Sequence, residues 1–192
     1  MQLAQYGIVH FATHGALSGQ VDGNSEPGLL MTPPEVASEE DDGYLTASEI
    51  TALKLDADWV ILSACNTAAG GASGAEALSG LARAFFYAQA RALLVSHWEV
   101  ASDTTVKLIT GAMRRLAADK TMGRAEAMRQ SMLALIDTGT PQEARPAFWA
   151  PFVVVGEGGI SAPVHSDKRK LDEVHPASWA TSTTMGKSGA PQ

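Results

Sequence analysis

The 192-residue sequence contains only one cysteine, Cys65, so no disulfide bond can form within the chain. Disulfide bonds belong to oxidising compartments, and a single free thiol suits a reducing one. The N-terminal residues lack the basic segment and the long apolar run of a secretory signal. No apolar stretch approaches the roughly 20 residues of a membrane-spanning helix. We therefore expect a cytoplasmic protein and no membrane partner.

Positive charge is also scarce. The chain has 14 lysine and arginine residues against 21 aspartate and glutamate residues, which gives a net charge of −7. No cluster of basic and aromatic residues occurs in the body of the chain, so we expect no nucleic-acid partner. One cysteine with scattered histidines makes no structural zinc site. The glycine-rich residues 70–74 lack the spacing of a phosphate-binding loop, and we expect no metal and no cofactor.

A hydrophobic content of 45% in 192 residues predicts one globular domain with a substantial core. Short apolar runs alternate with segments of helical periodicity, which is typical of an α/β fold with a parallel sheet. The predicted strands are residues 8–12, 59–64, 91–96 and 152–155. The predicted helices are residues 46–53, a helix that follows residue 74, and residues 102–118 and 122–136.

Some segments show no such pattern. Residues 16–42 are polar and rich in glycine and proline, which predicts a long loop at the edge of the site. Residues 161–192 have no apolar periodicity, so we assign residues 1–160 to the domain and residues 161–192 to a disordered tail. Within the helix 102–118, an apolar stripe is expected to face the sheet, formed by Val106, Ile109, Met113 and Leu116.

Two chemically active side chains follow the first two apolar runs. His14 comes just after residues 8–12, and Cys65 ends the run 59–64, 51 residues after His14. The carboxyl ends of neighbouring parallel strands converge on one crevice, so these two residues can meet there. A cysteine thiol becomes nucleophilic when an imidazole or positive potential assists it. The alternative is that Cys65 is a small buried hydrophobe. We expect His10, within the first run, to be a packed, hydrogen-bonded core residue.

Five ordered blocks between residues 8 and 156 resemble those of CHAT domains, which are relatives of caspases and separase. The blocks are His10-Phe11-Ala12-Thr13-His14-Gly15, Leu62-Ser63-Ala64-Cys65-Asn66-Thr67, Gly80-Leu81-Ala82-Arg83-Ala84-Phe85, Ser96-His97-Trp98-Glu99-Val100 and Phe148-Trp149-Ala150-Pro151-Phe152. The resemblance implies a caspase-like three-layer sandwich and a cysteine endopeptidase whose catalytic pair is His14 and Cys65. The roughly 50-residue spacing from His to Cys is also that of caspases.

The resemblance also suggests how the site would work. The backbone N–H groups of Gly15 and Cys65 would face the oxyanion that forms during hydrolysis. Similarity to separase implies that Asp103 is the acidic residue that binds a basic side chain of the substrate, and Glu99 is the alternative candidate for this role. Equally, Asp103 or Ser102 caps the following helix. Trp98 is expected to pack over the cleft.

Two functions remain open from the sequence. The first is a peptidase, and the second is a catalytically inactive caspase-like module with a regulatory or protein-interaction role. CHAT domains commonly follow helical repeats, so an upstream or separate helical-repeat partner is expected to select substrates. Caspase-like domains carry further strands before the His-bearing strand, so we expect a fold that is incomplete at its N-terminus. An uncovered sheet edge would then favour self-association.

Overall fold

The computed structural model describes residues 3–21, 24–38, 41–63, 74–98 and 102–160, except for the side chains of residues 74–79. Cys65, Glu99 and the predicted tail, residues 161–192, lie outside the described residues. The described chain alternates strands with helices, as the sequence predicted. In chain order the elements are η1 (Leu3–Gln5), β1 (Ile8–Phe11), β2 (His14–Ala16), β3 (Gly28–Leu30), β4 (Tyr44–Thr46), α1 (Ala47–Ala52), β5 (Trp59–Leu62), α2 (Gly74–Tyr87), β6 (Ala92–Ser96), α3 (Ser102–Ala118), α4 (Arg124–Thr138), α5 (Pro146–Trp149) and β7 (Phe152–Gly156).

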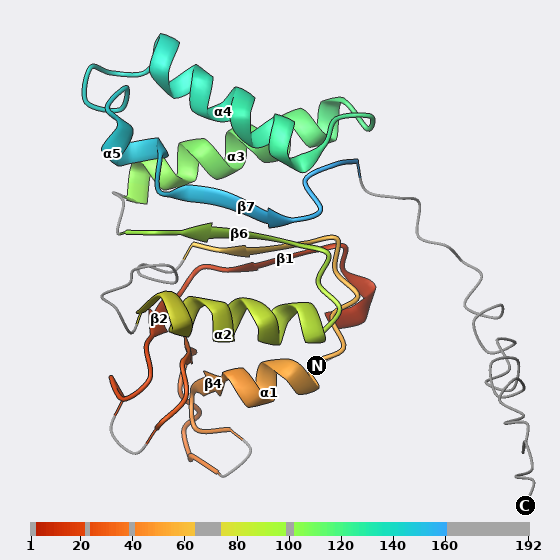
Figure 1. The fold of residues 1–192 in the computed structure, drawn as a ribbon, viewed down its shortest axis with the longest axis vertical. Helices are drawn as coiled ribbons and strands as arrows, with labels where there is room; N and C mark the ends of the chain where they lie inside the picture. The colour runs from red at the N-terminus through yellow and green to blue at the C-terminus, as the bar shows by residue number, and fades with distance from the viewer. Residues whose placement is uncertain (1–2, 22–23, 39–40, 64–73, 99–101, 161–192) are drawn as a thin grey trace, which may run out of the picture. The chain divides into compact units, whose positions relative to one another are not determined.

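The main sheet has the strand order β1-β5-β6-β7. β1, β5 and β6 run parallel, and β7 pairs antiparallel with β6. The helices α1 and α2 lie on one side of this sheet, and α3 and α4 lie on the other (Figure 1). The expected α/β fold, with a mainly parallel sheet between two helical layers, is therefore confirmed for the described residues.

The two central strands explain where the core lies. Every residue of β5 and β6 is buried, as expected for apolar strands that are covered on both faces. Val60 and Leu62 belong to a core cluster that includes residues of α1 and α2, whereas Trp59 and Ile61 belong to a cluster that includes residues of α3 and α4. The alternation of side chains along one strand thus fills two separate cores.

A second, smaller sheet corrects the prediction of a long loop over residues 16–42. The strands β2, β3 and β4 form an antiparallel sheet in that order, and β3 lies inside the expected loop. A Cβ atom on Gly28 would stand 2.5 Å from the carbonyl oxygen of Leu45, so the close approach of β3 to β4 requires glycine at this position. Three-residue strands among glycine and proline show no alternating pattern, which is why the sequence suggested a loop.

The predicted start of α1 is confirmed. Thr46 accepts a hydrogen bond from the backbone N–H of Glu49, and the Glu49 carboxylate accepts one from the backbone N–H of Thr46. This reciprocal arrangement is a capping box, for which the Thr-x-x-Glu spacing of residues 46–49 is typical.

The predicted bounds of α3 are also confirmed, but its expected core stripe is partly wrong. Ile109 is buried, together with Leu108 and Ala112, whereas Val106 is 58% exposed. Met113 and Leu116 are partly buried against the same core, so Val106 alone departs from the expected stripe. Val106, Ile109 and Met113 also line a pocket on the flank of the helix.

Candidate functional site

The carboxyl ends of β1 and β5 lie side by side at one edge of the main sheet. Phe11 pairs with Leu62 in the parallel ladder, and the backbone N–H of Ser63 donates to the carbonyl oxygen of Phe11 over 3.3 Å. The two segments that carry His14 and Cys65 therefore leave the sheet from adjacent positions. This edge is where open α/β sheets usually carry their binding crevice.

His14 is the first residue of β2 and is exposed. It pairs with Leu30 of β3, and Gly15, which is partly buried, pairs with Leu29. The hydroxyl of Thr13 donates to the carbonyl oxygen of Leu30, which fixes the turn between β1 and β2. The small sheet therefore holds His14 by backbone pairing at the end of β1.

His10 differs from its prediction in one respect. Its Nε2 atom lies 2.9 Å from the Ser63 hydroxyl oxygen, so the expected hydrogen bond is present, but the residue is exposed and is not part of the core. β1 is the edge strand, and the face that bears His10 is open to a pocket. Partial removal of the imidazole from water nevertheless lowers the pKa of His10 below 6.5.

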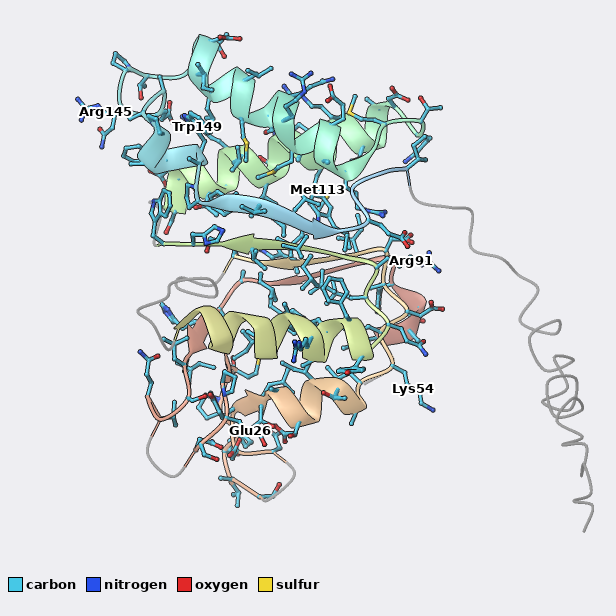
Figure 2. All side chains as sticks on the ribbon, viewed as in Figure 1. Glu26, Lys54, Arg91, Met113, Arg145 and Trp149 are labelled. Atoms are coloured by element: carbon cyan, nitrogen blue, oxygen red, sulfur yellow. The ribbon has the colours of Figure 1, made fainter. Side chains whose placement is uncertain are left out.

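A pocket of about 470 Å³ lies between this face of β1 and helix α3. Both histidines contribute to it, and Met113 extends from α3 into the space above the sheet (Figure 2). Sequence reasoning did not assign Ser63 or the α3 residues to a site, because their pattern resembles that of core positions. The lining residues are His10, Ala12, Thr13, His14, Ser63, Ser102, Thr105, Val106, Ile109, Thr110 and Met113.

The two predicted substrate-binding residues that the structure describes, Trp98 and Asp103, do not line this pocket. Trp98 follows β6, is 43% exposed and donates its indole N–H to the carbonyl oxygen of Ala147 over 3.0 Å. Asp103 is exposed in the first turn of α3, where a carboxylate is favourable near the positive end of the helix dipole. Its neighbour Ser102 lines the pocket, but Asp103 does not. Glu99 is not among the described residues.

The described residues contain no group of three or more His, Cys, Asp or Glu side chains that could hold a metal ion. They also include no helix long and apolar enough to cross a membrane.

The fold agrees with comparisons to known proteins. Tetratricopeptide repeat protein 28 of Mus musculus is 28% identical to the chain over 185 residues. The match covers 80% of this chain but 7% of the mouse protein. The family model of the CHAT domain matches residues 1–157, which is most of the sequence. This match runs from η1 to β7 and includes both walls of the pocket, and it establishes that the chain belongs to the caspase-like CHAT domain family.

Proposed function

We propose that this chain is a cysteine endopeptidase of the caspase-like class, with Cys65 as nucleophile and His14 as its acid–base partner. The observation that carries the proposal is the pairing of β1 with β5 up to Phe11 and Leu62. It brings the segments before His14 and Cys65 to one sheet edge, beside an open pocket. Nucleophilic catalysis by cysteine needs such a meeting of a thiol and an imidazole.

The proposed reaction proceeds in two steps. The Cys65 thiolate attacks the carbonyl carbon of the scissile peptide bond, and the resulting tetrahedral intermediate expels the amine as His14 donates a proton to the nitrogen. Water then attacks the thioester carbonyl, gives a proton to His14 and releases the carboxylic acid with the Cys65 thiolate. We assign the oxyanion to the backbone N–H groups of Gly15 and Cys65, each worth about 3 kcal/mol of the barrier.

Several finer features belong to the same proposal. Cleavage after a basic residue is a prediction from the resemblance and would use Asp103 or Glu99. A reduced thiol favours the cytoplasm as the location. The similarity to a mouse protein named for tetratricopeptide repeats supports a helical-repeat partner, either upstream or separate, that selects the substrate.

The second candidate is a catalytically inactive module that binds a polypeptide. The observation that favours this second function is the pocket itself, because a ligand can bind in a pocket of this size without any catalytic reaction. The reactivity of Cys65 toward an alkylating agent distinguishes the two candidate functions. Alkylation by iodoacetamide that is fast at neutral pH in the native chain, and slower in His14→Ala, favours the enzyme.

The direct test is peptide hydrolysis by Cys65→Ala and His14→Ala. Each change is expected to abolish turnover, while circular dichroism shows an unchanged fold. His97→Ala is the matched control, because exposed His97 contributes a backbone N–H to the carbonyl oxygen of Pro151 and does not line the pocket. Activity near that of the native chain in either test variant removes that residue from the mechanism.

A further inference from the structure

The pocket beside His14 is mainly apolar on one side and carries histidines on the other. The α3 wall combines the apolar side chains of Val106, Ile109 and Met113 with hydroxyl groups, and the opposite wall includes His10 of β1 and His14 of β2. No carboxylate, ammonium or guanidinium group belongs to the lining residues that the structure describes. Nothing in this described lining would therefore compensate the positive charge of a bound lysine or arginine.

Two polar side chains on the floor of the pocket are bonded to each other. The imidazole of His10 is hydrogen-bonded to Ser63, and the Ser63 hydroxyl also lies 3.5 Å from the carbonyl oxygen of Phe11. Partial burial lowers the pKa of His10, which favours the neutral imidazole. The hydrogen bond between His10 and Ser63 is thus made within the floor of the pocket and needs no ligand.

The volume of about 470 Å³ falls within the range of small-molecule sites. It is therefore more than large enough for a branched aliphatic or an aromatic side chain. Burying such a side chain against Val106, Ile109 and Met113 is favourable, whereas a cationic side chain would lose its water without gaining a counter-charge.

We propose that this pocket is a subsite for one uncharged, apolar side chain of a polypeptide, of the size of leucine, methionine or phenylalanine. The inference rests on the proposed function for its occupant, since a side chain held here would belong to the peptide that meets His14. The pocket would thus favour an apolar residue over a basic residue of the peptide at this subsite.

Binding can be measured without hydrolysis. The probes are N-acetyl-leucinamide and N-acetyl-argininamide, titrated into Cys65→Ala protein with labelled methyl groups. The leucine probe is expected to shift the methyl signals of Val106, Ile109 and Met113 saturably, and the arginine probe to bind at least about tenfold more weakly. Equal binding of the two probes, preference for arginine, or no shift at these three residues overturns the proposal.

A charge placed at the rim provides the matched test. Val106→Glu adds a carboxylate to the pocket at an exposed position, so the fold should tolerate it. We expect it to weaken the leucine probe and to strengthen the arginine probe. Val36→Glu is the control, because Val36 is 83% exposed and does not line the pocket. Identical probe affinities in Val106→Glu and Val36→Glu contradict the assignment.

The same experiment separates this inference from the proposed function. If the leucine probe binds saturably but the native chain hydrolyses no peptide, the subsite proposal is supported and the peptidase proposal is contradicted. If the chain hydrolyses peptides and Val106→Glu does not change which peptides it cleaves, the peptidase proposal is supported and the subsite proposal is contradicted. Methyl shifts that grow with protein concentration in the absence of any probe would show that a second copy of the chain occupies the pocket, and this result would also overturn the proposal.

Discussion

The two faces of strand β1 differ in burial: one is packed against the core and the other is open. On the side of α2, Phe11 is only 9% exposed and its ring centre lies 5.5 Å from that of Phe85, with the rings tilted at 50°. On the side of α3, Ile8 is 44% exposed and His10 is open to the pocket. One four-residue strand therefore contributes to the core with one face and to the candidate site with the other.

The neighbouring strand β5 shows that residue type does not cause this difference. Trp59 and Ile61 of β5 point to the α3 side and are fully buried, although Ile8 on β1 is equally apolar. What differs is position, because β5 lies inside the sheet and β1 lies at its edge. Stability and binding are thus expected to depend on different faces of the same strand.

The largest effect is expected on the closed face. Phe85→Ala removes a fully buried ring that packs against Phe11, and such a truncation costs about 3 to 5 kcal/mol of unfolding free energy. Chemical denaturation followed by circular dichroism measures this loss. Val106→Ala, on the open side, serves as control and should change the free energy by less than about 0.5 kcal/mol. Equal losses in the two variants would show that the faces do not differ.

The next effect concerns association through the open face. Exposed apolar side chains on an edge strand favour contact between copies, so the chain is expected to form dimers or larger species as its concentration rises. Ile8→Lys should shift it toward monomers while changing the unfolding free energy by less than about 0.5 kcal/mol. Analytical ultracentrifugation tests this against Val36→Lys. A monomer at all concentrations in the native chain contradicts the prediction.

A smaller effect follows from His10. Its pKa is lowered in the folded chain, so the unfolded chain binds more protons as the pH falls below the ordinary value of 6.5. The folded state should therefore lose stability between about pH 7 and pH 5. His10→Gln is expected to reduce this loss, as seen in the melting temperature across that range. Parallel pH profiles for the native chain and His10→Gln would refute this account.

The smallest effect concerns the anchoring of α3, the far wall of the pocket. The Glu143 carboxylate accepts hydrogen bonds from Lys107 at 2.5 Å and from the backbone N–H of Thr140 at 2.8 Å, and these lower its pKa to about 2. This stabilisation is complete above the ordinary pKa of 4.5 and is lost as the pH falls toward 2.

Glu143→Gln should therefore lower the melting temperature at pH 7 and have no effect near pH 2. Glu35→Gln, at an exposed position, is the control. A difference between native chain and Glu143→Gln that persists unchanged to pH 2 would show that the charge of Glu143 is not the cause.

Sequence signals were sufficient where local chemistry determines the structure. The bounds of α3 and the capping box at Thr46 follow from side chains within a few residues, and the buried strands β5 and β6 follow from continuous apolar runs. The strand β3 was missed because its three residues are stabilised by β2 and β4, which are distant in the sequence.

The exposure of Val106 and His10 was missed for a different reason. Periodicity identifies an apolar stripe but not the element, if any, that covers it. Whether Val106 faces a core or a pocket depends on where the edge of the sheet falls, and this is a property of the whole fold. The pairing of His14 with Cys65 stays a prediction, because Cys65 lies outside the described residues.

The small sheet gives His14 a dependence on residues far along the chain. β3 lies between β2 and β4, and His14 is held in place by its pairing with Leu30 of β3. The position of β3 depends in turn on its close approach to β4 at Gly28. Any side chain at Gly28 would push β3 away from Leu45 and carry the imidazole of His14 with it. A substitution that lies outside the pocket and is not at Cys65 would thus displace His14 from the position in which we propose that it meets the thiol.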